Sequence, residues 1–140
     1  MEPCIFCEIA SGKKSAHVVH ETESAIAFLD IHPLVDGHTM VVPRRHYRRL
    51  ADMPDEDVRE LFSAVRAVAQ KVLQGTGCED LTIGINDGPS AGQVVPHLHV
   101  HLIPRSRGDG GGNVHSIIRR PTRFSLDEMR DRIRVQEARS

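Results

Sequence analysis

One segment restricts the fold more than any other, because polar and aliphatic residues alternate in it without a break. From His97 to Leu102 the chain places three histidines between aliphatic residues. Successive side chains of a β-strand point to opposite faces of a sheet. A strand over Val95–Pro104 therefore puts the three imidazoles on one face and the aliphatic side chains in the core.

The spacing of these histidines (97, 99 and 101) argues against a single shared metal ion. Alternate residues of a strand are about 6.6 Å apart, so the outer two lie about 13 Å apart. Zinc needs its nitrogen ligands at about 2.0–2.1 Å. We therefore expect the three imidazoles to have different roles, and one role open to a neutral imidazole is nucleophilic attack on phosphorus. A surface strand that carries three histidines by chance is the alternative.

The segment before the histidines is suited to an anion. Residues Asn86–Gln93 form a polar stretch with two glycines that leads directly into the histidine strand. Loops of this kind offer backbone N–H groups to anions. Together the loop and the histidine row indicate a phosphate ligand.

The remaining strands and helices follow from periodicity and turn residues. Four further short strands are expected, at Val18–Glu21, Ala25–Leu29, Thr39–Pro43 and Leu81–Asn86. The clearest helix repeats apolar residues every three or four positions between Pro54 and Gly75. The expected terminal helices are a short one at about Phe6–Ala10 and one from Ser125, where Ser125 and Glu128 form a capping box, to about Glu137.

These elements predict an α+β fold, in which about five antiparallel strands pack against one long helix. With 140 residues and neither a linker nor a repeat, residues 1–140 are expected to form one domain with a helical tail from about residue 125. A sheet this small leaves an edge strand open, which favours a homodimer.

Composition excludes several classes of protein. The formal net charge is −1, which argues against general nucleic-acid binding. No apolar run is long enough for a transmembrane helix, and the N-terminus lacks the pattern of a secretory signal. Three cysteines without a signal are typical of a reducing compartment, so we expect a cytoplasmic protein without membrane or nucleic-acid partners.

The histidine row resembles the motif of the histidine triad (HIT) family, in which three histidines alternate with apolar residues. Other segments are similar to family segments, namely Cys4–Ile9, Ala27–Ile31, Gly37–Pro43 and Asn86–Gly88. The resemblance implies a small nucleotide-binding hydrolase or transferase, usually a homodimer. It also implies cleavage at the α-phosphate of nucleoside phosphoramidates or dinucleoside polyphosphates. A purine nucleotide, an AMP derivative, is the expected substrate.

The resemblance implies a role for each matching residue. His99 matches the nucleophile, which would form a nucleotidyl-histidine, and His101 matches a ligand of the phosphate oxygens. His97 matches a supporting position, and His38 matches the residue that buttresses it. The matching substrate-binding positions are Asp30 for the ribose, Asn86 and Gln93 near the phosphate, and Phe6, Ile9, Phe28 and Ile31 around the base.

A structural zinc site is a separate prediction. The spacing Cys4-x-x-Cys7 supplies one half of such a site, and His46 and His97 are the candidates for the other half. Some bacterial members of the family look similar in this respect. A reduced thiol pair without metal is the alternative.

One observation limits the resemblance. Well-known members carry Ser or Thr three residues before the first triad histidine, where this chain has Val94, so a hydroxyl is missing and the branch of the family is open. The competing function is a non-enzymatic nucleotide-binding or scaffolding protein. A cluster of arginines, Arg44, Arg45, Arg48 and Arg49, is interpreted as a solvated surface or as a contact for a second phosphate.

Overall fold

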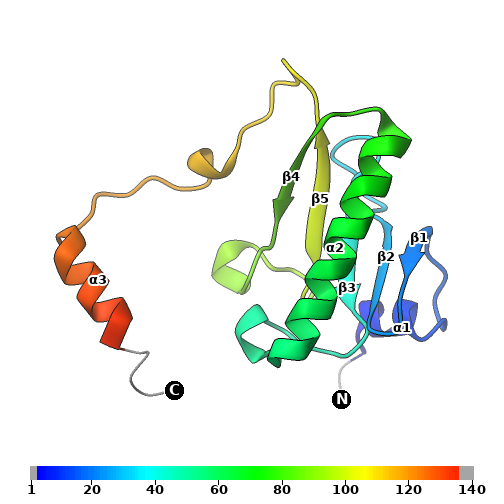
Figure 1. The fold of residues 1–140 in the computed structure, drawn as a ribbon, viewed down its shortest axis with the longest axis horizontal. Helices are drawn as coiled ribbons and strands as arrows, with labels where there is room; N and C mark the ends of the chain where they lie inside the picture. Colours follow the sequence, from blue (N-terminus) through cyan, green and yellow to red (C-terminus); the bar gives the residue numbers. More distant parts are fainter. Residues whose placement is uncertain (1–2, 136–140) are drawn as a thin grey trace. The chain divides into compact units, whose positions relative to one another are not determined.

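The computed structural model describes residues 3–135, which divide into two compact units at residue 110. The first unit contains all the strands and the long helix (Figure 1). Its elements are α1 (Ile5–Ala10), β1 (Val18–Glu21), β2 (Ala25–Leu29), β3 (Thr39–Pro43), α2 (Asp55–Thr76), β4 (Asp80–Gly84) and β5 (Val100–Arg105). The second unit contains the helix α3 (Leu126–Arg134). None of the described helices is long and apolar enough to cross a membrane.

The five strands form one antiparallel sheet in the order β1-β2-β3-β5-β4. The turn between β1 and β2 closes on Thr22, whose hydroxyl accepts the backbone N–H of Ala25 at 2.9 Å. The predicted α+β class and the five antiparallel strands are therefore confirmed, and β1 and β4 are the edges of the sheet.

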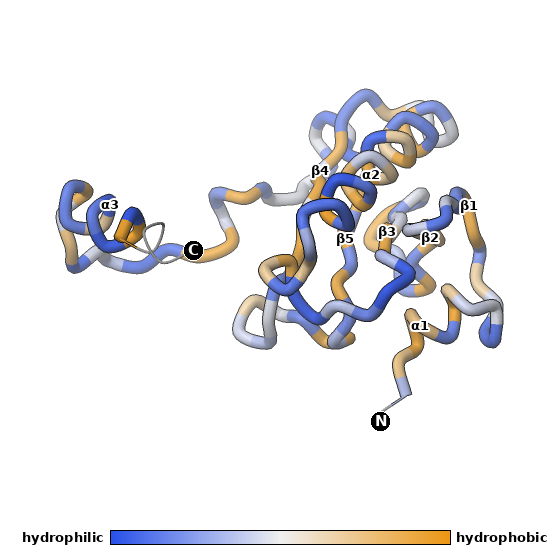
Figure 2. The backbone as a smooth tube through the Cα atoms, turned by 60° about the horizontal axis from the view of Figure 1, so that its bottom comes forward, coloured by the Kyte–Doolittle hydropathy of each residue, from blue (hydrophilic) through white to orange (hydrophobic). Residues whose placement is uncertain are grey.

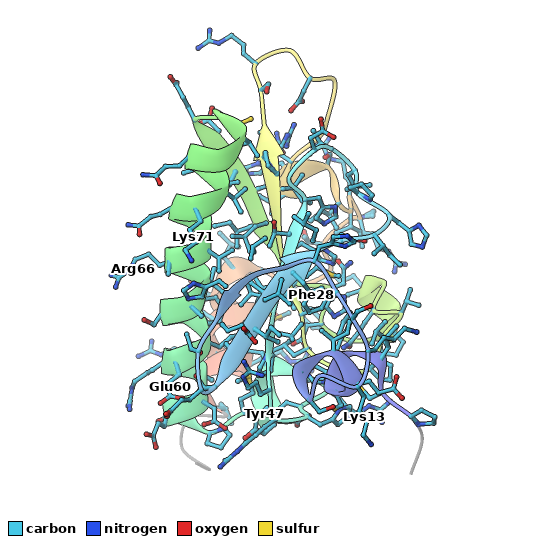
Figure 3. All side chains as sticks on the ribbon, turned by 90° about the vertical axis from the view of Figure 1, so that its right-hand side faces the viewer. Lys13, Phe28, Tyr47, Glu60, Arg66 and Lys71 are labelled. Atoms are coloured by element: carbon cyan, nitrogen blue, oxygen red, sulfur yellow. The ribbon has the colours of Figure 1, made fainter. Side chains whose placement is uncertain are left out.

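Helix α2 covers one face of the sheet. Its buried residues are Leu61, Ala64, Val65, Val68 and Val72, and hydrophobic and hydrophilic stretches alternate along it (Figure 2). Figure 3 shows Arg66 on the side of α2 that faces away from the sheet. The helix ends at Thr76 and is capped by Gly77, which has a φ of 74° and donates its N–H to the Leu73 carbonyl. The predicted end at Gly75 is therefore too early, because the left-handed position that favours glycine lies at Gly77.

The opposite face of the sheet carries the second core cluster and α1. This cluster contains Phe6 and Ile9 of α1 with residues of β2 and β3, namely Ile26, Phe28, Met40 and Val42. Phe28 lies within the sheet in Figure 3. The predicted terminal helices are confirmed where they are described, and Ser125 and Glu128 form the expected capping box. The expected last residues of α3, 136 and 137, lie outside the described residues.

The histidine strand is shorter than predicted. Of the three histidines, only His101 lies in β5, while His97 and His99 lie in the segment before it. Pro96 has no N–H, and the Leu98 N–H bonds to the Tyr47 carbonyl at 2.7 Å instead of a neighbouring strand. The alternation of faces persists, because the aliphatic residues between the histidines all lie in the core under α2. Similarly, the fourth strand ends at Gly84 and not at the predicted Asn86.

Candidate functional site

The three histidines of the row lie on the sheet face that carries α1. His97 and His99 are buried and His101 is half-buried. The rings of His99 and His101 are 5.0 Å apart at their centroids, and the ring of Phe6 lies 5.1 Å from that of His99. The imidazoles of the row therefore pack beside the ring of Phe6, which we call the aromatic wall.

The tautomer of His99 follows from its backbone contact. Its Nδ1 lies 2.8 Å from the carbonyl oxygen of His97. A carbonyl only accepts, so Nδ1 carries the proton and Nε2 keeps its lone pair. The nitrogen at the far side of the ring is therefore the nucleophilic one.

His38 contacts His101, which corrects the expectation that it buttresses His97. His38 Nε2 lies 2.9 Å from His101 Nδ1, whereas His97 donates from its Nε2 to the Pro43 carbonyl at 2.8 Å. The register explains this difference, because Met40 of β3 pairs with His101 and the chain places His38 just before β3.

The contacts of His38 also fix the proton on His101. The Leu34 N–H donates to His38 Nδ1 at 3.2 Å, so His38 carries its proton on Nε2 and donates to His101 Nδ1. His101 therefore carries its own proton on Nε2. Burial lowers the pKa of His101 to about 4, helped by the neighbouring His99 and His38, and burial also lowers the pKa of His38. Both imidazoles are neutral near pH 7.

Asp30 follows β2 and joins this group. Its Oδ2 lies 3.6 Å from His38 Nε2, and its Oδ1 accepts the His32 N–H at 2.9 Å. The side chain is only partly exposed. Asp30, His38 and His101 thus bring a carboxylate and two imidazoles together at one end of the row.

The loop before the histidines differs in part from the expectation. Asn86 is exposed, but both ends of the Gln93 amide bond to backbone: its oxygen accepts the Gly88 N–H at 2.8 Å, and its nitrogen donates to Arg48 at 2.9 Å. Gln93 therefore holds the loop in shape. Val94, which takes the place of the usual hydroxyl residue, is 89% exposed.

Arg49 lies over this loop, a position that the sequence did not predict for it. A Cβ added to Gly88, which has a φ of 108°, would lie 3.1 Å from the Arg49 guanidinium. The only sequence signal was membership of an arginine cluster. Two other members are committed elsewhere, since Arg44 donates to Ala10 and Arg45 pairs with Asp57 at 3.8 Å.

The residues expected around the base separate into two groups. Phe6, Ile9 and Phe28 lie together in the second core cluster, where Phe6 is 5% exposed and its ring is 5.5 Å from that of Phe28. Ile31 is 72% exposed and lies outside this cluster.

The four predicted metal ligands converge. The ligand atoms of Cys4, Cys7, His46 and His97 all lie within 4.8 Å of one another. The Nδ1 of His97 is 3.3 Å from the sulfur of Cys4 and 3.2 Å from the Nδ1 of His46, and Cys7 Sγ lies 3.4 Å from His46 Nδ1. A tetrahedral zinc ion with ordinary bond lengths separates such ligands by about 3.3–3.6 Å. The donor set and its spacing therefore fit zinc.

The protonation of these ligands matters for binding a cation. Burial, with the neighbouring Cys4, raises the pKa of the Cys7 thiol to about 11, and burial lowers the pKa of His97 to about 4. His97 thus offers a free Nδ1 lone pair at neutral pH, while the bond from its Nε2 to Pro43 orients the ring. A metal has to displace the thiol protons when it binds.

A family comparison decides what kind of protein carries these groups. The family model for the HIT domain matches residues 11–108, which is more than half of the chain. The chain belongs to the HIT family. The match covers most of the first unit, including the whole histidine row. HIT proteins are nucleotide-binding hydrolases and transferases, and this coarse class applies to the chain.

Curated HIT relatives include enzymes. An uncharacterised HIT-like protein of Methanocaldococcus jannaschii is 46% identical over 107 residues, which cover 76% of this chain and 82% of the relative. An asymmetrical bis(5′-nucleosyl)-tetraphosphatase of Schizosaccharomyces pombe is 39% identical over 98 residues (70% of the chain, 54% of the enzyme). An adenylylsulfatase of Arabidopsis thaliana is 33% identical over 106 residues (76% and 54%). The chain thus matches about half the length of each of these two enzymes.

Solved HIT structures share the fold. A HIT protein from Bacillus subtilis has a TM-score of 0.82 at 32% identity, covering 99% of this chain and 98% of that one. A zinc-bound histidine triad protein from Mycobacterium smegmatis has a TM-score of 0.72 at 38% identity, covering 76% and 78%.

A cavity of about 640 Å³ lies apart from the HIT histidines. It is bordered by the β1–β2 turn, the segment after β3 and the N-terminal half of α2, and none of the predicted site residues lines it. Its wall is built from internal pairs: the Tyr47 hydroxyl donates to Asp57, and Arg45 pairs with the same carboxylate. Because these side chains are already paired with one another, we assign no ligand to the cavity.

Proposed function

We propose that this HIT protein cleaves purine nucleotide derivatives at the α-phosphate through a covalent nucleotidyl-histidine on His99. The observation that carries the proposal is the tautomer of His99. Because the His97 carbonyl holds the proton on Nδ1, Nε2 is free to attack phosphorus.

In the first step, His99 Nε2 forms a bond to the α-phosphorus. The bond from phosphorus to the leaving group breaks, and the leaving group keeps the electron pair. The proton on His101 Nε2 hydrogen-bonds the phosphate oxygens, where charge increases in the transition state. His38 supports this by accepting from Leu34 and donating to His101.

In the second step, water attacks the phosphorus and gives up a proton to the solvent. The bond to His99 breaks, its electron pair returns to Nε2, and AMP leaves. We assign Asp30 to the ribose hydroxyls, Asn86 to the phosphate, and Phe6 and Phe28 of the second core cluster to the side of the base. The leaving group is a nucleoside polyphosphate, or an amine that takes up a proton from the solvent as its bond to phosphorus breaks. The names of the two enzyme relatives support phosphoanhydride substrates.

Mass spectrometry tests the proposal. Protein quenched during turnover of diadenosine tetraphosphate or adenosine 5′-phosphoramidate should carry one adenylate on the peptide with His99. The control is His99→Ala, which lacks the proposed nucleophile and should carry no adenylate. A protein that binds AMP but never carries an adenylate fits the non-enzymatic alternative and contradicts the covalent mechanism.

We also propose that Cys4, Cys7, His46 and His97 hold one structural zinc ion. When bound, a zinc ion with four protein ligands is closed to substrate and contributes to folding. The spacing of the ligand atoms and the zinc-bound HIT neighbour support this site.

A further inference from the structure

The short helix α1 connects the metal cluster to the aromatic wall. An isolated helix of six residues is not stable in water, so tertiary contacts determine the position of α1. At its start Cys4 caps the helix by accepting the Cys7 N–H at 3.4 Å. At its end the Ala10 carbonyl accepts from Arg44 at 2.8 Å. The N-terminal end is therefore held by the two thiols that belong to the metal cluster.

Phe6 lies between these two cysteines and faces the histidine row. Its ring meets the ring of His99 edge-on, with an interplanar angle of 75°, and that of Phe28 at 60°. Any shift of the turn that carries Cys4 and Cys7 moves the Phe6 ring with it.

His97 provides a second connection between the two places. Its Nδ1 belongs to the metal cluster, and its ring lies 5.8 Å from that of Phe6 at 83°. The wall beside the base and the metal ligands are thus parts of one packed unit.

We propose that zinc binding and nucleotide binding in this protein are positively coupled through α1, and that Phe6 is the residue that transmits the coupling. The inference rests on the proposed function, because it needs both an adenine base against Phe6 and a zinc ion at the cluster. Zinc fixes the turn from Cys4 to Cys7, and the fixed turn presents Phe6 to the base in its binding position.

Coupling between two binding sites is reciprocal. If zinc tightens AMP binding by a given factor, AMP tightens zinc binding by the same factor. Couplings of this kind are typically about 5–150-fold, and we expect about tenfold here. Ribose 5-phosphate lacks the base and should show no coupling.

The experiment measures both halves of the cycle. Calorimetry gives the Kd of AMP for zinc-loaded and zinc-free protein, and competition with a chromophoric chelator gives the zinc affinity of the loaded protein with and without saturating AMP. Equal factors of about ten in the two halves support the coupling. A factor of one in the chelator competition overturns it, even where the zinc-free protein is too unstable for calorimetry.

Two matched variants test whether Phe6 transmits the coupling between the zinc site and the nucleotide site. Phe6→Leu should retain zinc and lose most of the coupling, whereas Ile5→Leu, which changes the exposed neighbour on the same helix, should keep it. Full coupling in Phe6→Leu overturns the role of Phe6. Absence of AMP binding in both zinc states refutes the proposed function and the coupling with it, whereas AMP binding with one Kd in both states refutes the coupling alone.

Discussion

Each imidazole of the triad is oriented by a different backbone or side-chain partner. His97 donates to Pro43, His99 donates to His97, and His101 accepts from His38. The free nitrogens consequently differ: His97 and His99 each keep a lone pair, on Nδ1 and Nε2, whereas His101 keeps a proton on Nε2. We propose that these three nitrogens bind the metal, attack phosphorus and hydrogen-bond the phosphate oxygens, respectively.

Replacing the nucleophile is the most direct prediction at the residue scale. His99→Ala should abolish turnover and keep the AMP Kd within about tenfold, because the residues around the ribose and base remain. Steady-state assays and calorimetry on the purified variant check this. Residual activity above a few per cent would contradict the covalent route.

Acid should destabilise the protein through the pair formed by His38 and His101. Burial holds the pKa of His101 at about 4, below the ordinary value of 6.5, so the unfolded chain binds more protons between these values. Stability from this pair is complete above about pH 6.5 and is lost as the pH falls towards 4. The groups that face the pair are His99 and Asp30, and Asp30 opposes the shift.

Urea unfolding of chelator-treated protein between pH 7.5 and pH 4 measures this dependence without a contribution from metal loss. In the control variant His38→Gln, one titrating imidazole is absent, so the slope should be shallower. An unchanged slope would show that other groups cause the acid loss.

At the scale of elements, α1 is held by side chains and α2 by its apolar face. The position of α1 depends on the cysteines, Phe6, Ile9 and the contact with Arg44. Helix α2 buries an apolar face that includes Leu61 and Val68 against the sheet. The two helices should therefore respond to different perturbations.

Zinc content tests the proposed metal ligands at the start of α1. Protein as purified should contain about one zinc per chain and lose it on acidification, because thiolate ligands must be deprotonated, with a fall in thermal stability. Elemental analysis and differential scanning calorimetry measure the two effects. Full zinc retention in the double variant Cys4→Ser, Cys7→Ser would refute the ligand set.

A truncation in α2 tests the main core. Leu61→Ala should lower the free energy of unfolding by about 2–5 kcal/mol, since Leu61 is buried between the helix and the sheet. Arg66→Ala, on the exposed side of the same helix, should change it by less than about 0.5 kcal/mol. Equal losses in the two variants would contradict the packing of α2 on the sheet.

At the scale of the whole molecule, we propose that the sheet and α2 join two copies into a homodimer. Strand β4 is an edge of the sheet, and its residue Ile83 is 46% exposed. An apolar residue on an open edge favours pairing with a second chain. Sedimentation at micromolar concentration should give about twice the chain mass of 15.6 kDa. A mass near that of one chain would contradict this prediction.

The sequence by itself determined the elements and their faces. Alternation around His99, the repeat in α2 and the capping box at Ser125 are local patterns, and each is a property of residues that are neighbours in the chain. The cysteine spacing, with His46 and His97 as candidates, also predicted a ligand set whose atoms converge in the structure.

Apart from this ligand set, only the tertiary structure decided which distant groups meet. His38 and His101 are 63 residues apart, and the register of β3 against β5 makes them partners. The tertiary structure also brings the Gln93 amide to the Gly88 N–H and the Arg49 guanidinium over Gly88. Local periodicity fixes the direction of a side chain relative to its own backbone. Its partner depends on strand order and register, which arise from the packing of the whole sheet.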